Sequence, residues 1–379
     1  MRIVYLSSRD AKDIRQWSGT LYYMAQSLSK HAGEVIYVGP YSPKILLFIL
    51  KALKKTIQII FRKNYNITYS YILSMAYKYY FTPRIKRANP DVVFAASASV
   101  EMSQLKLNCP IVYLGDATFN LLNGTYSNFS NLVGFSRWES ELIENKTYKN
   151  SAAVVFSSTW ATNSAINDYK VSPEKIHLIP YGANLKAIPK PEELIHKSIS
   201  SKIKLLFLGL DWERKGGDIV YLSFLELQKK GVNVELTICG CIPPKHVQHT
   251  EIKVIPFLNK NNDTDFKVLY NLLLESHFLF VPSRSDCTPI VFCEANAFGI
   301  PVITSEVGGI PSVIKNGING YMLPVDAKPE EFAGLIATFS DGSSDYSKLT
   351  RSSRAYFDDT LNWDSWGIAL NQILIDAIH

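Results

Sequence analysis

The chain has 379 residues, of which 47% are hydrophobic, 20% charged and 12% aromatic, with a formal net charge of +6. This length allows two domains of ordinary size, and the composition excludes intrinsic disorder and fibrous repeats. No run of about 18 apolar residues occurs, so we expect no membrane-spanning helix, and the apolar run at the start is too short for a secretory signal. The five cysteines lack the spacing of a zinc site, which favours reduced thiols in a cytoplasmic protein.

Short apolar runs alternate with longer helical patterns along the whole chain. In the first half the predicted strands are Arg2–Leu6, Val35–Val38, Val92–Ala95, Ile111–Leu114 and Ala153–Ser157. In the second half they are Lys204–Leu208, Val234–Cys239, Ile252–Ile255, Phe278–Val281 and Pro301–Thr304. Continuous apolar strands separated by helices are typical of parallel βαβ units whose sheet is buried on both faces. The pattern therefore predicts an α/β fold.

The strand and helix pattern pauses once, near residues 185–201, where Pro189 and Pro191 indicate a linker. We expect two doubly wound, Rossmann-like domains, an N-terminal one over residues 1–185 and a C-terminal one over residues 186–360. The segment 361–379 carries tryptophan and leucine side chains on one helical stripe, so we expect a helix that crosses back onto the first domain. Open α/β sheets bind ligands at the carboxyl ends of their strands, which predicts a site in a cleft between the two domains.

A glycine and two basic residues follow the predicted strand 204–208. Gly209 would let a ligand approach the backbone, and Arg214 and Lys215 come just before a helical pattern. A helix N-terminus together with two fixed cations can bind phosphate oxygens. An isolated basic pair of this kind is equally common in a solvated turn.

A second candidate segment follows the strand 278–281. Asp286 and Glu294 lie eight positions apart and bracket the start of a helix that Thr288, Pro289 and Ile290 would open. The backbone N–H groups of such a helix start can hold a phosphate or a sugar hydroxyl, and a carboxylate one turn later can accept two hydrogen bonds from a ribose diol. Two carboxylates at this spacing are common on helices, so the signal comes from the surrounding sequence.

That surrounding sequence resembles the donor-binding half of family-4 glycosyltransferases, which are retaining enzymes of the GT-B fold. The matching segments are Gly209–Gly217, the run from Pro282 to Gly309 with Ala-Asn-Ala-Phe-Gly-Ile-Pro-Val-Ile at 295–303, the Gly-Gly-Ile-Pro turn at 308–311, and Asn316–Gly320. Leu178–Asn184 is similar to the segment that joins the two domains in this family. The resemblance implies two Rossmann-like domains facing across a cleft and a nucleoside-diphosphate sugar as the donor.

The resemblance also implies roles for individual residues. Arg214 and Lys215 match the basic pair that neutralises the donor diphosphate, and Glu294 matches the glutamate that binds the nucleotide ribose. Asp286 stands where the family has a glutamate beside the transferred sugar, and Phe257 lies where such enzymes hold the base. The implied donor-binding residues are Ser18, Gly19 and Thr20 of the N-terminal glycine loop, Gly209, Arg214, Lys215, Phe257, Asp286, Thr288, Pro289, Ile290 and Glu294.

Three positions depart from the family pattern. Asp286 is one methylene shorter than the usual glutamate, and Ser312 or Val313 stands where a glutamate is expected after the Gly-Gly turn. No histidine follows the fourth strand, and Asp116 stands there instead, either as a catalytic or acceptor-binding residue or as the N-cap of the next helix. The candidate catalytic residues are Asp116, Arg214, Lys215 and Asp286.

The resemblance implies retaining sugar transfer without a metal or cofactor. Negative charge on the leaving diphosphate would be stabilised by Arg214, Lys215 and helix N-termini, and no Asp-x-Asp metal signature follows a strand. The expected partners are a nucleotide-sugar donor and a glycan or lipid-linked glycan acceptor of surface polysaccharide or lipopolysaccharide biosynthesis, and not nucleic acid. Two alternatives stay open: another enzyme of this fold, a sugar phosphorylase or a nucleotide-sugar epimerase, and a catalytically silent nucleotide-sugar-binding subunit.

The positive charge is concentrated between residues 35 and 90, a stretch without Asp or Glu. Residues 44–63 join an apolar face to lysines, and aromatic residues follow at 69–81. This combination is typical of a helix lying on anionic lipid, and equally of a helix that packs its apolar face inward with its lysines in water. In the first case the enzyme would be peripheral on the inner face of the cytoplasmic membrane. The candidate membrane-contact residues are Lys51, Lys54, Lys55, Arg62 and Lys63.

Overall fold

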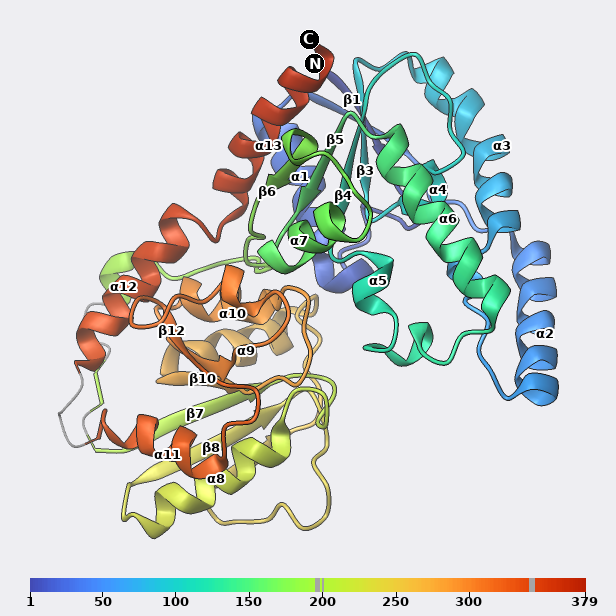
Figure 1. The fold of residues 1–379 in the computed structure, drawn as a ribbon. Coiled ribbons are helices and arrows are strands. Elements are labelled where there is room, and N and C mark those ends of the chain that lie inside the picture. Colours follow the sequence, from blue (N-terminus) through green and yellow to red (C-terminus); the bar gives the residue numbers. More distant parts are fainter. Residues whose placement is uncertain (195–197, 200, 341–344) are drawn as a thin grey trace. The chain divides into compact units, whose positions relative to one another are not determined.

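The structure is a computed structural model that describes residues 1–194, 198–199, 201–340 and 345–379. It contains two compact units, one formed by Met1–Pro180 with Trp363–His379 and the other by Tyr181–Asn362 (Figure 1). The segment 185–201, where we expected a linker, belongs to the second unit, and its residues 195–197 and 200 lie outside the described residues.

The first unit is built on a parallel sheet of six strands in the order β2-β1-β3-β4-β5-β6. The strands are β1 (Arg2–Leu6), β2 (Glu34–Val38), β3 (Val92–Ala96), β4 (Ile111–Gly115), β5 (Ala153–Phe156) and β6 (Ile176–Leu178). Every residue of β3, β4 and β5 is buried, which is why their sequences are apolar without alternation. The predicted α/β fold class is confirmed, and the predicted strands end within one residue of the observed ones.

Helices cover both faces of this sheet. They are α1 (Thr20–His31), α2 (Lys44–Phe61), α3 (Tyr71–Ala88), α4 (Ser99–Met102), α5 (Phe119–Leu122), α6 (Gly134–Asn150), α7 (Thr159–Asn167) and α13 (Trp363–Ile378). In Figure 1 the red α13 lies beside α1, although more than 300 residues separate them in the chain. Trp366 of α13 is fully buried and its ring meets that of Phe94 on β3 edge-on, so the last helix is part of the core of the first unit.

The second unit repeats the architecture with the strand order β12-β11-β10-β7-β8-β9, again all parallel. Its strands are β7 (Ile203–Leu208), β8 (Val234–Cys239), β9 (Ile252–Ile255), β10 (Phe278–Val281), β11 (Val302–Ser305) and β12 (Gly320–Leu323). Its helices are α8 (Gly217–Lys229), α9 (Asp263–Glu275), α10 (Ile290–Ala297), α11 (Pro329–Ala337) and α12 (Tyr346–Asp359).

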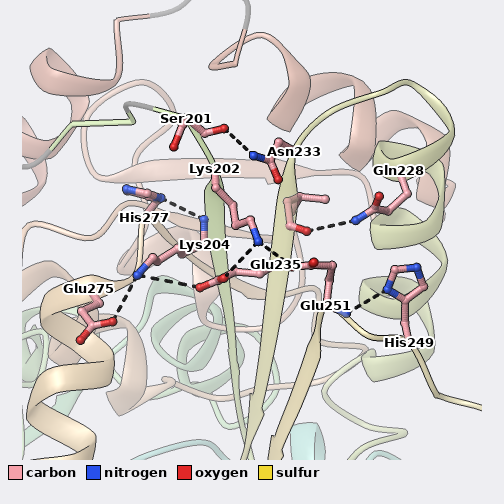
Figure 2. Close-up of polar contacts among 11 residues, drawn as sticks. Ser201, Lys202, Lys204, Gln228, Asn233, Glu235, His249, Glu251, Glu275 and His277 are labelled. Atoms are coloured by element: carbon pink, nitrogen blue, oxygen red, sulfur yellow. Dashed lines mark hydrogen bonds and ion pairs between the residues drawn. The ribbon is translucent and has the colours of Figure 1, made fainter.

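Charged side chains surround the amino ends of the strands in the second unit (Figure 2). Lys202 is ion-paired with Glu251 at 2.7 Å, and Lys204 with Glu275 at 3.2 Å. The buried His277 accepts a hydrogen bond at Nδ1 from the backbone N–H of Lys204. These partly exposed pairs contribute little to stability. The groups able to recognise a ligand gather at the other end of the sheet.

Candidate active site

Three loops meet at the carboxyl ends of the neighbouring strands β7, β10 and β11. They are the loop 209–216 before α8, the loop 282–289 before α10, and the loop 306–309 after β11. The backbone N–H of Arg284 donates to the carbonyl oxygen of Arg214 at 2.8 Å, and that of Gly309 donates to the carbonyl oxygen of Asp286 at 3.1 Å. The candidate segments singled out in the sequence therefore form one surface.

Two glycines make this close approach of the loops possible. Gly216 has φ +72°, and a Cβ on it would lie 2.1 Å from the carbonyl oxygen of Pro282. Gly308 has φ +57°, and a Cβ on it would lie 2.1 Å from the carbonyl oxygen of Asp286. Any side chain would clash with backbone at both positions and would be strained by the positive φ. The glycines of the two motifs are thus required by the packing of one loop on another.

The centre of the site is the carboxylate of Asp286, on which two cations converge. Its Oδ2 accepts a hydrogen bond from Lys215 Nζ at 2.5 Å and one from Ser283 Oγ at 3.2 Å, and Arg214 Nη1 lies 3.6 Å away. The side chains of Lys215 and Asp286 are 10% and 12% exposed. Arg214 Nε also lies 3.5 Å from Oδ2 of the more exposed Asp211, so two cations and two carboxylates meet here. Two cations fixed side by side suit a ligand that carries phosphate.

A second ion pair fixes the loop that carries the basic residues. Nη1 and Nη2 of Arg284 donate to the carboxylate of Asp218 on α8, at 2.8 and 2.6 Å, and Nη1 also donates to the carbonyl oxygen of Glu213. These hydrogen bonds from Arg284 lower the pKa of Asp218 below its ordinary value. Sequence reasoning missed Arg284, because its partner lies 66 residues away in the chain.

Helix α10 brings Glu294 to the same end of the sheet. The helix begins at Ile290, and its N-cap, Pro289, makes no side-chain capping bond, which leaves the helix start for a ligand. Glu294 is 2% exposed, and its Oε1 accepts a hydrogen bond from Lys260 Nζ at 2.7 Å. Lys260 and Phe257, which is 63% exposed, belong to the loop between β9 and α9. Lys260 was also missed, since Asn-Lys-Asn-Asn reads as an ordinary polar loop.

Of the remaining donor-binding candidates in the second unit, Gly209 directly follows β7, and Thr288 is buried next to the start of α10. A Cβ on Gly209 would lie 3.1 Å from Cγ of Lys215, so the glycine leaves room for the lysine stem. Asn296 of α10 and Asn319 form a buried amide pair at 2.7 Å that anchors the helix. The helix that carries Glu294 is thus held by the Asn316–Gly320 segment.

The glycine loop of the first unit is a run of left-handed residues. Trp17, Ser18 and Gly19 have φ values of 48°, 56° and 95°, and α1 begins at Thr20. Non-glycine residues in this region cost on the order of 1–3 kcal/mol each and tend to persist at ligand-binding loops. The conformation therefore fits a loop that presents backbone N–H groups to an anion at the start of α1.

Asp116 directly follows β4 in the first unit and is half-buried. Its Oδ1 accepts a hydrogen bond from Ser157 Oγ, after β5, at 3.5 Å. Asp116 is not the N-cap of α5, because the side chain of Thr118 takes that role. With the N-cap interpretation excluded, Asp116 is a polar side chain at the carboxyl ends of the strands of the first sheet.

The basic candidates lie on or just after α2. Lys51, Lys54 and Lys55 belong to the helix, Arg62 is its C-cap with φ 52°, and Lys63 follows. Within the described part of the chain, no helix is long and apolar enough to cross a membrane, and no group of three or more His, Cys, Asp and Glu side chains is arranged to hold a metal ion.

The curated proteins that the chain resembles in sequence include several glycosyltransferases. Of these, the chain is 30% identical over 202 residues to the amylovoran biosynthesis glycosyltransferase AmsK of Erwinia amylovora, covering 51% of this chain and 47% of AmsK. The chain spans about half the length of the curated relatives it matches.

Solved structures share the fold along almost the whole chain. Alr3699/HepE of Anabaena, solved with UDP and glucose, has a TM-score of 0.65 at 14% identity and covers 99% of this chain and 100% of that one. The lipopolysaccharide outer core galactosyltransferase WaaB has a TM-score of 0.64 at 15% identity, and the match covers 98% of this chain and 100% of WaaB.

Two family models match consecutive parts of the sequence. Glycosyltransferase Family 4 matches residues 19–187, and Glycosyl transferases group 1 matches residues 192–356. The second match contains Arg214, Lys215, Asp286 and Glu294, and the first contains Gly19 and Asp116. With its two parallel six-stranded sheets, the chain therefore belongs to the family-4, group-1 glycosyltransferases of the GT-B fold, as the sequence resemblance predicted.

Proposed function

We propose that the protein is a retaining glycosyltransferase that moves a sugar from a nucleoside-diphosphate sugar to a glycan or lipid-linked glycan, in surface polysaccharide or lipopolysaccharide biosynthesis. The observation that carries the proposal is the convergence of Arg214 and Lys215 on Asp286 beside the start of α10. The names of AmsK and WaaB, and the UDP and glucose bound to HepE, support the class of reaction and of donor.

The proposed chemistry is cleavage of the bond between the anomeric carbon and the diphosphate oxygen. Arg214 and Lys215 would stabilise the charge that develops on the diphosphate, so that no metal or cofactor is needed. The acceptor hydroxyl oxygen would bond to the anomeric carbon on the same face, and its proton would pass to the departing phosphate oxygen. Glu294 would bind the ribose, Asp286 would lie near the transferred sugar, and Asp116 would bind the acceptor.

The first experiment is a thermal-shift screen of nucleoside diphosphates and their sugars, followed by an assay of nucleoside diphosphate release. A transferase releases the diphosphate at full rate only when an acceptor is added. Release that needs inorganic phosphate would indicate a phosphorylase, a changed sugar without transfer an epimerase, and binding without release a silent subunit. NMR of the product's anomeric configuration tests retention, and activity in EDTA tests independence from metal.

The proposed site of action is a membrane surface, which the outer face of α2 would contact. Of the 18 residues of α2, Leu50 and Ile57 are buried. Ile45, Phe48 and Ile59 are 80%, 75% and 70% exposed, and their spacing places them on one stripe of the helix. In Figure 1 the blue α2 lies at the outer edge of the first unit. Burying these side chains in lipid would be worth roughly 1.5–3 kcal/mol each.

A cationic stripe runs along α2 next to this apolar stripe. Lys44, Lys51 and Lys55 fall on one side of the helix at spacings of seven and four residues, and all three are exposed. Each basic residue close to an anionic lipid surface contributes on the order of 1 kcal/mol. The other interpretation of the sequence is that α2 packs its apolar face inward. This explains why Leu50 and Ile57 are buried, but it leaves Ile45, Phe48 and Ile59 exposed to water. The exposure of α2 therefore favours a peripheral enzyme on anionic lipid.

Co-sedimentation with vesicles of phosphatidylglycerol and phosphatidylcholine tests the membrane proposal. The charge variant replaces Lys51, Lys54, Lys55, Arg62 and Lys63 with Gln, and the apolar variant replaces Ile45, Phe48 and Ile59 with Ser. Both variants should stay in the supernatant instead of sedimenting with the vesicles, and added salt should weaken the binding of the wild type to the vesicles. The matched control replaces five exposed lysines of the second unit, namely Lys229, Lys230, Lys245, Lys253 and Lys328. Absence of wild-type binding at low salt would favour a soluble acceptor.

A further inference from the structure

The carboxylate of Glu294 is almost completely buried and is ion-paired with a lysine from another loop. It is 2% exposed, and Lys260 Nζ, on a side chain that is 24% exposed, lies 2.7 Å from its Oε1. A buried carboxylate without a partner is costly and tends to take up a proton or to move. The ammonium of Lys260 gives Glu294 this partner and favours one orientation of its side chain.

The loop that carries Lys260 is itself held in place. Lys186 is ion-paired at 2.8 Å with Asp263, the first residue of α9, and the backbone N–H of Asn259 donates to the carboxylate of Asp265 at 2.9 Å. These contacts lie on both sides of Lys260 in the chain. The ammonium thus approaches Glu294 from a loop that these contacts join to the start of α9.

Lys260 uses only part of the hydrogen-bonding capacity of Glu294. A carboxylate has two oxygens with about four acceptor sites, and Lys260 takes one of them on Oε1. Asp286 differs, since Lys215 and Ser283 donate to the same oxygen of its side chain and Arg214 lies nearby. Of the two candidate carboxylates, Glu294 therefore keeps more of its acceptor sites for a diol.

We infer that Lys260 is a positioning residue for nucleotide recognition: it holds the side chain of Glu294 in one orientation, in which the remaining acceptor sites bind the ribose hydroxyls. This inference rests on the proposed function, since it takes the ligand to be a nucleoside diphosphate. Its consequence is selectivity for ribose. A hydroxyl bonded to a charged group is worth roughly 10- to 100-fold in affinity, so the 2′-deoxy nucleotide should bind that much more weakly.

The test is isothermal titration calorimetry of the full chain with UDP, GDP and ADP, and then with the 2′-deoxy form of the tightest binder. The wild type should prefer the ribonucleotide by about 10-fold or more. Lys260→Met keeps the length of the side chain and removes the charge, so the preference should fall below about 3-fold, as in Glu294→Gln. Lys260→Arg should restore the preference, and Lys253→Met, an exposed lysine on β9, should leave it unchanged.

The double variant Lys260→Met, Glu294→Gln should be no less selective than either single variant, because the two residues act through one contact. An unchanged ribose preference in Lys260→Met would overturn the inference. Equal loss of affinity for both nucleotides would also overturn it, because that is the result of a merely structural role. If the wild type binds no nucleoside diphosphate, the proposed function itself fails, and the inference with it.

Discussion

At the residue scale, Asp286 occupies the point at which the cations of the candidate site meet. Lys215 bonds to it at 2.5 Å and Arg214 lies 3.6 Å away, so both cations are held in place before any ligand arrives. Fixed charges of this kind stabilise a developing negative charge without reorganisation during the reaction. A donor diphosphate would share these two cations with Asp286.

The single variants Arg214→Ala and Lys215→Ala should each lower turnover by roughly 10²-fold or more, the scale for loss of one charge-stabilising donor. Glu294→Ala should in addition weaken donor binding. Initial rates of nucleoside diphosphate release measure both effects. The control is Lys204→Ala, a partly exposed cation at the amino end of β7, which should keep wild-type turnover. Ordinary activity in the double variant Arg214→Ala, Lys215→Ala would rule out diphosphate binding at this site.

Glu144 is a second buried carboxylate, in the core of the first unit. Its Oε1 accepts two hydrogen bonds, one from Tyr148 Oη at 2.5 Å and one from the backbone N–H of Phe119 at 3.2 Å. Its Oε2 has no hydrogen-bond partner among the described residues. Burial raises the pKa of Glu144 from 4.5 to about 7. The raised pKa means that the folded state binds the proton of Glu144 more tightly than the unfolded state does. The stability that this proton contributes to the fold is complete below pH 4.5 and is lost as the pH rises through about 7.

Glu144→Gln should therefore remove this pH dependence, since the amide oxygen can still accept from Tyr148 and Phe119. We expect the variant to be more stable than the wild type above pH 7, by on the order of 1–3 kcal/mol, and nearly equal to it at pH 5. Urea unfolding at pH 5 and pH 8 measures the difference. Glu306→Gln, at an exposed position, is the control. Equal effects of Glu144→Gln at both pH values would contradict the assignment.

At the element scale, the packing of α13 on α1 depends on a glycine. A Cβ on Gly367 would lie 2.1 Å from Ser27 Oγ and 2.8 Å from Cδ2 of His31, both on α1. The two helices are further joined by Asp364, which lies 2.7 Å from Nζ of Lys30 and 2.6 Å from Nε2 of His31. A side chain at position 367 would push the helices apart and weaken the burial of Trp366.

Two matched substitutions of a helical glycine by alanine should have opposite effects. Gly367→Ala should destabilise the protein by roughly 1–3 kcal/mol because it overpacks the contact between α1 and α13. A Cβ on Gly334 in α11 would meet nothing within 4 Å, so Gly334→Ala should stabilise by roughly 0.5–1 kcal/mol through helix propensity. Denaturant midpoints measure both. A stabilising Gly367→Ala would show that the helices can separate without cost.

At the scale of the whole molecule, the chain builds the first unit, then the second, and returns to complete the first. The returning segment, Trp363–His379, buries Trp366, Leu370, Ile373 and Leu374. Each such side chain contributes roughly 1.5–3 kcal/mol when it is buried. The second unit is continuous in sequence and has its own sheet and core.

The two units should therefore differ when they are expressed alone. Residues 181–362 should fold and unfold cooperatively, whereas residues 1–180 should be unstable or aggregate until a peptide of residues 363–379 is added. Thermal unfolding followed by circular dichroism measures the stability of each fragment, with and without the peptide. A fragment 1–180 as stable as the full chain would show that α13 is dispensable for the first unit.

The sequence by itself determined the fold class and most strands, and it placed candidate site residues after β4, β7 and β10. A central strand of a parallel sheet is buried on both faces, so it must be apolar over its whole length, which is a local property visible in the sequence. The same logic missed β6 (Ile176–Leu178) and β12 (Gly320–Leu323). Both are edge strands with partly exposed side chains, and their pairing is decided by their neighbours.

Only the tertiary structure decided which side chains act together. Glu294 and Lys260 are 34 residues apart and Arg284 and Asp218 are 66 apart, and each pair forms because the strand order β10-β7-β8-β9 brings distant loops to one edge of the sheet. The exposure of the apolar stripe on α2 was likewise open in the sequence, since an amphipathic pattern fits a core or a lipid surface equally well. Hydrophobic pattern is encoded locally, whereas an ion pair or a covered face depends on what the rest of the chain places against it.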